Sequence, residues 1–207
     1  MRQPERGVDA RILLVGAPGS GKGTQAELLC RRLGLVHVST GDMLRAAAKE
    51  HTLIGETVCG TMAAGELVSD RIVFDLVCRR LEPMDRAGVG FVLDGYPRTL
   101  TQLVDLQHLL RGDGVDRAIE LAVPRTELIS RLTGRGREDD AEEIVTERLL
   151  SHEEETRPMI TALRTQGKLA VVDGRQGMHC VHDGILRELA RAGLVSSRDS
   201  LTDAAAL

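Results

Sequence analysis

The sequence predicts an α/β protein in which five parallel strands form one sheet with helices on both faces. Short apolar runs alternate with longer stretches whose apolar residues recur at helical spacing, which is typical of parallel sheets. The first run, residues 12–15, is four branched apolar residues without a polar break, as expected of a strand buried on both faces. The 207 residues are enough for one well-buried core but short for two full domains.

The other strands are predicted where short apolar runs meet glycine or polar residues. Because the carboxyl ends of parallel strands meet at one edge of a sheet, the residues that follow these strands should form a common site. Two longer connections predict a helical insert, made of two helices broken at Gly55, and a short lid. The later strands are expected at residues 36–39, 90–94, 118–123 and 169–172. The single domain is expected to divide into a core of 10–39, 69–130 and 141–192, an insert of 40–68, a lid of 131–140 and a frayed tail of 193–207.

A glycine-rich loop follows the first strand and opens an amphipathic helix. Its glycines allow positive φ and a close approach to a ligand, so successive N–H groups can point at one anion, and Lys22 adds a mobile cation. A tight turn that happens to be rich in glycine is the plain alternative. The strand before the loop and the helix after it favour phosphate binding. The loop comprises Gly16, Ala17, Pro18, Gly19, Ser20, Gly21, Lys22, Gly23 and Thr24.

Two arginines and one carboxylate are predicted at the same edge of the sheet. Arg45 lies one turn into the helix that follows the second strand, and Arg98 follows the third strand. Each alone could be a solvent-facing side chain, but together with the loop they predict an anion site. Asp94 ends the third strand, where a P-loop protein holds the water shell of Mg²⁺, and capping of the next turn is the alternative.

Several segments resemble those of adenylate kinases and other nucleoside monophosphate kinases. They are GAPGSGKGTQ, VSTGDMLRAA, GELVSD, FVLDGYPRTLTQ and a late R-x-x-G-R series, and the resemblance covers essentially residues 11–192. The loop is characteristic, because Gly23 stands where most phosphate loops have a Ser or Thr for Mg²⁺. The resemblance implies a P-loop fold with a monophosphate-binding insert. It also implies a transferase that converts MgATP and AMP reversibly to two ADP, with these nucleotides as partners and Mg²⁺, but no zinc, as cofactor.

The same resemblance implies a role for each residue of the expected site. Arg131 would stack on the ATP adenine, and lid arginines would surround the phosphates. The ATP site would comprise the loop residues together with Arg131 and Arg135. The AMP site would comprise Thr40, Arg45, Leu67, Val68, Gly95, Arg98, Gln102, Arg137 and Arg148. The catalytic charges would be Lys22, Arg98, Arg135, Arg137 and Arg148, with Asp94 acting on Mg²⁺ through bound water.

Composition argues against several other classes of protein. A net charge of −4 disfavours a nucleic-acid binder. No apolar run approaches the ~20 residues that cross a bilayer, and the first residues form no apolar signal core, so we expect no membrane association. Four scattered cysteines without a C-x-x-C pair predict the reducing cytoplasm as the location. We expect a monomer.

Three rival functions share part of this pattern. A UMP/CMP kinase has the same loop and arginines, but Thr40 before Gly-Asp, together with Gln102, fits the adenine-selective branch. A GTPase is disfavoured because the chain contains no Asn and therefore no N-K-x-D guanine motif. A weakly catalytic regulator that binds adenine nucleotides is the third rival. His179 and His182 have a spacing that could bind metal but lack a third ligand, and His37 is expected to pack in the core.

Two departures from the family pattern concern the lid and the helix after it. Only Gly136 separates Arg135 from Arg137, so the lid is shorter than in the short-lid branch of the family. His152 occupies a position where the family usually has Tyr. Cover of the triphosphate depends on lid length, whereas the arginines can still reach in from flanking helices. Shielding from water is therefore the function most exposed to the shortening.

We predict measurable hydrolysis of MgATP in the absence of AMP. Inserting four or so polar residues after Gly136, a length typical of short loops, should suppress this leak by lengthening the cover. The measurement is phosphate release, with Lys22→Met as the control. Release no higher than in the control, or unchanged by the insertion, would mean that the native lid covers the site.

Overall fold

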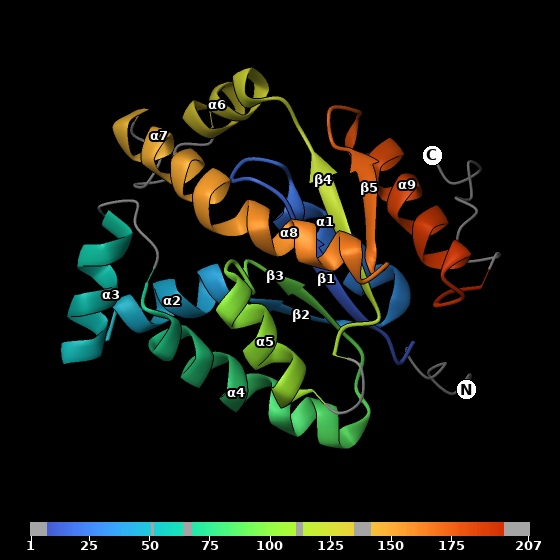
Figure 1. Ribbon diagram of the computed structural model, residues 1–207, viewed down its shortest axis with the longest axis horizontal. Helices are drawn as coiled ribbons and strands as arrows, with labels where there is room; N and C mark the ends of the chain where they lie inside the picture. The colour runs from blue at the N-terminus through green and yellow to red at the C-terminus, as the bar shows by residue number, and fades with distance from the viewer. Residues whose placement is uncertain (1–7, 51, 64–67, 111–113, 135–141, 197–207) are drawn as a thin grey trace.

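The structure, a computed structural model, describes residues 8–50, 52–63, 68–110, 114–134 and 142–196. Five parallel strands form one sheet in the order β2-β3-β1-β4-β5 (Figure 1). The predicted five-stranded α/β fold is confirmed, and the predicted strand ends differ from the observed ones by at most one residue. The strands are β1 Arg11–Val15, β2 Val36–Ser39, β3 Phe91–Asp94, β4 Arg117–Ala122 and β5 Leu169–Asp173.

Alternate residues of the central strand β1 face opposite layers of helices. Leu13 and Val15 belong to one apolar cluster, and Ile12 and Leu14 belong to the other, as the two-residue period of a strand requires. The first cluster packs under α4 Asp70–Ala87, α5 Leu100–Leu109 and α8 Arg157–Thr165, and the second under α1 Lys22–Leu33 and α9 Met178–Arg191 (Figure 1). Burial on both faces explains why β1 has no polar residue from Ile12 onward.

The predicted insert contains two helices, α2 Thr40–Ala48 and α3 Leu53–Ala63. The prediction that they break at Gly55 is wrong, because the break falls between residues 49 and 52 and Gly55 lies inside α3. A Cβ on Gly55 would lie 2.2 Å from the Glu50 carbonyl oxygen and 2.7 Å from that of Ala47. Gly55 therefore allows α3 to pack closely against the end of α2, rather than ending a helix. The limits of the insert and lid stay predictions.

The connection after β4 forms a pair of helices beside the glycine-rich loop. Leu128 and Leu132 of α6 Arg125–Thr133 pack against Val145 and Leu149 of α7 Glu142–Ser151, and Ala17 of the loop packs on the same cluster. The helical segment that begins with α7 is not regular throughout. A π-helical turn, η1 His152–Thr156, separates α7 from α8. Residues 135–141, which hold most of the predicted lid, lie outside the described residues.

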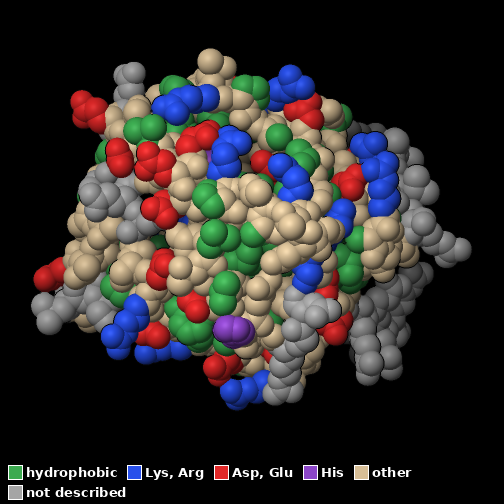
Figure 2. Space-filling view, viewed as in Figure 1, with side chains coloured by type: hydrophobic (Ala, Val, Ile, Leu, Met, Phe, Trp, Pro, Cys, Tyr) green, Lys and Arg blue, Asp and Glu red, His purple; other side chains and the backbone are tan. Residues whose placement is uncertain are grey.

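The surface carries both signs of charge. On the face shown in Figure 2, acidic and basic side chains are interspersed rather than gathered by sign. Within the described part of the chain, no helix is long and apolar enough to cross a membrane.

Gly90, which directly precedes β3, packs closely against the backbone of the segment that precedes β1. A Cβ there would lie 2.1 Å from the Val8 carbonyl oxygen and 2.7 Å from the Ala10 nitrogen. Because both are backbone atoms, rotation of a side chain cannot relieve the clash. We predict that Gly90→Ala lowers the free energy of unfolding by about 2–3 kcal/mol, as overpacking does.

Urea unfolding measures this loss, with Gly60→Ala as the matched control. A Cβ on Gly60 meets nothing within 4 Å, and the residue lies inside α3. Alanine should therefore stabilise that position by up to about 1 kcal/mol. Equal effects at the two glycines would contradict the close contact.

Candidate functional site

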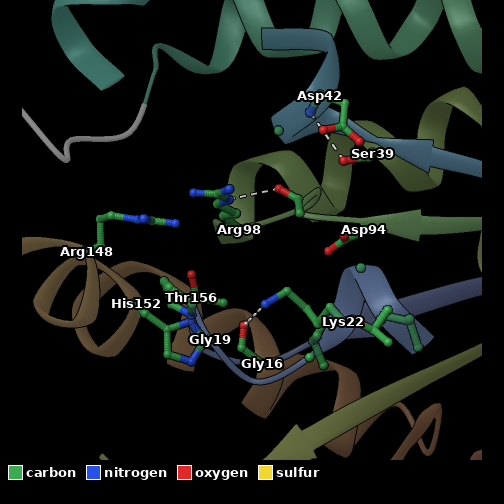
Figure 3. A pocket seen from close by; sticks show the side chains of 18 of the residues that line it. Gly16, Gly19, Lys22, Ser39, Asp42, Asp94, Arg98, Arg148, His152 and Thr156 are labelled. Atoms are coloured by element: carbon green, nitrogen blue, oxygen red, sulfur yellow. Dashed lines mark hydrogen bonds between the residues drawn. The ribbon is translucent and has the colours of Figure 1, made fainter. Parts of the chain in front are cut away.

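A cavity of about 500 Å³ opens at the carboxyl edge of the sheet (Figure 3). The loop after β1, the ends of β2 and β3, and helices α2, α6 and α7 with η1 form its wall. The structure thus brings together most of the residues that the sequence predicted. Those on the wall are Gly16, Pro18, Gly19, Gly21, Lys22, Gly23, Thr24, Arg45, Asp94, Gly95, Arg98, Arg131 and Arg148.

The loop after β1 has the backbone conformation that its glycines predict. Gly16, Gly19 and Gly21 all have positive φ, and a Cβ on Gly16 would lie 2.9 Å from the Leu121 carbonyl oxygen. Gly21 caps α1 without a side-chain hydrogen bond to the helix, and no acidic residue lies in the first turn. The N–H groups of that turn therefore face the cavity with the positive end of the helix dipole, which suits an anion.

Lys22 folds back over this loop. Its Nζ donates hydrogen bonds to the carbonyl oxygens of Gly16 (2.7 Å) and Ala17 (3.0 Å) and to the Ser20 hydroxyl (3.4 Å). Figure 3 shows the bond to Gly16. Ala17 and Ser20 do not line the cavity, but both help to position Lys22, which does. These neutral oxygens hold the ammonium group without cancelling its charge.

Arg98 brings a second cation into the interior. Its Nε donates to the Gly95 carbonyl oxygen at 2.9 Å, and its side chain and that of Arg148 point toward one another (Figure 3). Burial lowers the pKa of Arg98, and the charges of Arg148 and Arg45 lower it further, whereas Asp94 opposes them. Arg45 pairs with Asp42 on its own helix. Guanidinium groups that face one another favour an anion between them.

The side chains of Asp94, at the end of β3, and His37, within β2, lie close together. Nε2 of His37 is 3.8 Å from Oδ2 of Asp94, which is too long for a hydrogen bond but close enough for charge attraction. The Asp94 carboxylate raises the pKa of His37. Burial works to raise the pKa of Asp94, but His37, Lys22 and Arg98 hold it below its ordinary value. Asp94 is therefore an ionised carboxylate among cations.

The expectation that His37 packs in the core is wrong, since His37 lines the cavity. Strand β2 places His37 and Ser39 on one face, and Ser39 pairs in register with Asp94. The alternation of polar and apolar residues in this strand was the sequence signal that His37 and Ser39 share a polar face. Other cavity residues that the sequence reasoning did not assign are Glu27, Ser39, Gly41, Asp42, Pro97, Ser151, His152 and Thr156.

Three residues predicted for the AMP site lie behind the cavity wall. The Thr40 hydroxyl donates to the Asp94 carbonyl oxygen at 3.3 Å, and Val68 is buried in the core. Gln102 donates from Nε2 to Asp70 at 2.6 Å, and its Oε1 accepts the Arg98 backbone N–H at 2.7 Å. Their contacts with a base stay predictions. Leu67, Arg135 and Arg137 lie outside the described residues.

The donor set at Asp94 fits Mg²⁺. This ion is commonly held by one or two carboxylates together with substrate phosphates, and Asp94 is ionised and faces the loop. A Cβ on Gly23 would lie 3.5 Å from Oδ2 of Asp94, so glycine leaves this approach open. Among the residues that the structure describes, no three His, Cys, Asp or Glu side chains cluster as metal ligands.

This fold and this cavity define a P-loop protein built to hold more than one phosphate group. The family model for adenylate kinase matches residues 14–168. The chain is 44% identical over 184 residues to an adenylate kinase of Maricaulis maris, covering 86% of this chain and 97% of that one. It is 41% identical over 196 residues to an adenylate kinase of Clavibacter michiganensis, covering 92% and 98%. The chain therefore belongs to the adenylate kinase family of phosphotransferases.

The pKa values of the two cavity histidines, His37 and His152, should be shifted in opposite directions. Asp94 raises the pKa of His37, whereas burial, with help from Lys22, lowers that of His152 to about 4. NMR titration of nucleotide-free, metal-free protein should therefore show one imidazole above 6.5 and one near 4.

The variant Asp94→Asn separates the two causes. It should lower the pKa of His37, because the carboxylate that raises it most is lost while burial still lowers it against the smaller effects of Asp42 and Glu27, and it should leave that of His152 depressed. Parallel shifts of both histidines would contradict the separate environments described above.

Proposed function

We propose that this protein transfers the γ-phosphoryl group of MgATP to AMP, reversibly, giving two ADP. One observation carries the proposal: a single cavity holds two separate cationic sites. The first is the glycine loop with Lys22, and the second is the guanidinium pair Arg98 and Arg148, with Arg45 beside it. Asp94 lies close enough to both that Lys22 and Arg98 each lower its pKa.

Phosphoryl transfer needs positioning and charge neutralisation more than covalent chemistry. The loop N–H groups would bind the triphosphate, and Lys22 would exchange its loop carbonyls for phosphate oxygens. Arg45 and Arg98 would hold the monophosphate in line with it. Arg148, which points toward Arg98, would stabilise charge that develops on the transferred group.

Asp94 would hold Mg²⁺ through bound water, and the ion would supply charge neutralisation at the triphosphate. Arg131 would contact the ATP adenine. It is held by Glu127 of its own helix and donates to the Gly174 carbonyl oxygen at 2.9 Å, so it is braced at the cavity wall. We further propose a monomer. The four free cysteines are typical of a reducing compartment and support a cytoplasmic location.

A coupled assay for ADP tests the proposal. MgATP is offered with AMP, CMP, UMP, GMP and dAMP in turn, and AMP should be the preferred acceptor. Lys22→Met should lower kcat by at least ~10²- to 10³-fold, as loss of one transition-state donor does. Preference for UMP or CMP would establish the rival kinase. Tight nucleotide binding without turnover would establish the regulator.

The arginine pair should distinguish the two nucleotides. We predict that Arg98→Lys and Arg45→Lys each raise the KM for AMP far more than the KM for ATP, because lysine cannot form the planar two-bond contact with phosphate. Arg98→Lys should have the larger effect, since Arg98 is more deeply buried. Steady-state kinetics measure both constants, and an equal rise for ATP would contradict the two-site assignment.

A further inference from the structure

The helix that borders the cavity changes its winding where it passes the phosphate loop. Across η1, the Arg157 backbone N–H donates to the His152 carbonyl oxygen, five residues earlier, instead of four as in an α-helix. Such π turns are rare and are frequent at functional sites. Figure 3 shows His152 and Thr156 across the cavity from Arg98, and both line the same cavity as Gly19 of the loop.

The π turn decides which side chains of this helix face the phosphates. In a regular α-helix, residues seven apart share a face, so Glu155 would follow Arg148 onto the cavity wall. A turn with i→i+5 bonds winds less per residue, and the wall carries Thr156 instead. Glu153, Glu154 and Glu155 are all exposed. The helix therefore turns three carboxylates away from the anion site.

Two polar side chains take their place on the wall, His152 and Thr156. Thr156 is only 6% exposed, and His152 is half-buried. In the described part of the chain, neither the His152 ring nor the Thr156 hydroxyl has a hydrogen-bond partner. Neither polar group is fully enclosed by the protein, so both can form hydrogen bonds to a ligand in the cavity. The mechanism above uses neither residue.

We propose that His152 and Thr156 are phosphate-contacting residues that donate hydrogen bonds to the phosphate chain of a nucleotide in the cavity. The inference rests on the proposed function, since it takes nucleotides as the ligands. The charged groups that act on the imidazole are Lys22 from α1, Arg98 from the loop after β3, and Glu153 and Arg157 from its own helix. Bound phosphate therefore meets a donor set between two established cationic sites.

The placement of His152 predicts that nucleotide binding is coupled to the uptake of a proton. Burial, Lys22, Arg157 and Arg98 lower the pKa of His152 to about 4, and Glu153 opposes them, so the ring is neutral in the nucleotide-free protein near neutral pH. Bound phosphates add negative charge, which favours the imidazolium form and raises the pKa. Binding then takes up a proton. The nucleotide affinity of the native protein should gain over that of a non-titrating variant as pH falls from 7 toward 5.

Calorimetry with the β,γ-methylene analogue of MgATP tests both parts. Binding is measured at pH 5.5 in two buffers of different ionisation heat, which gives the protons exchanged. His152→Phe should weaken binding about 10- to 100-fold and reduce the proton uptake, as expected for loss of a hydrogen bond to a charged group. Thr156→Val should weaken binding about 3- to 10-fold with proton uptake intact. His108→Phe, on the exposed side of α5, is the matched control and should match the native protein.

His152→Gln separates donation from titration, because glutamine keeps an N–H donor but cannot take up the proton. It should bind within a few-fold of the native protein at pH 7 and lose the uptake. Native affinity in a folded His152→Phe protein, or unchanged uptake in His152→Gln, would overturn the proposal. Should His152→Phe fail to fold, His152→Gln and Thr156→Val decide. ADP formation is measured in parallel. Altered binding in these variants without ADP formation by the native protein would count against the proposed function alone, whereas normal turnover with unaltered binding would count against this inference alone.

Discussion

Positive charge gathered inside the protein is the constraint on which the site depends. Buried cations are costly unless they are hydrogen-bonded or paired, and the cavity satisfies them with local groups. Lys22 uses loop carbonyls, Arg98 uses the Gly95 carbonyl and Arg45 uses Asp42. Most of these partners are neutral oxygens, so the cavity keeps a net positive field. An entering phosphate can take the place of the neutral oxygens on Lys22 and Arg98.

The sheet makes this concentration of charge possible. All five strands run parallel, so β1, β2 and β3 deliver the loop, Ser39 and Asp94 to the same edge. The apolar clusters on both faces of β1 hold that edge rigid, because each strand residue packs against helices. Glycines at close contacts, such as Gly16 against the Leu121 carbonyl, set the distance between the loop and β4. The site is therefore built on packed elements rather than on a surface loop.

Helix α7 with η1 closes the cavity from the side opposite the sheet edge. Its regular part supplies Arg148, and its π turn supplies His152 and Thr156 while the three glutamates face solvent. An acidic sequence thus borders an anion site without opposing it. The neighbouring pair α6 and α7 packs on Ala17 through Leu128, Leu132, Val145 and Leu149. Movement of this pair would reach the phosphate loop directly.

The strands, the phosphate loop and the positions of Arg45 and Arg98 could be predicted from the sequence, because each depends on a short local pattern. Branched apolar runs define buried strands, and glycines with positive φ define the loop. Prediction from the sequence failed where contacts between distant segments decide the role of a residue. Gly55 looked like a helix break, but its role is set by the end of α2, and His37 looked like a core residue until β3 placed Asp94 beside it.

Which polar residues line the cavity depends on contacts that form only when the chain folds. Gln102, expected at the base, is bonded to Asp70 and to the Arg98 backbone, whereas His152 and Thr156 reach the wall through a π turn that no local pattern announced. The spacing of Arg148, His152 and Thr156, four residues apart, was present in the sequence. Glu155 also fitted that helical face, and only the winding of the folded helix against its neighbours separates the two, because side-chain direction depends on backbone turn as well as on sequence position.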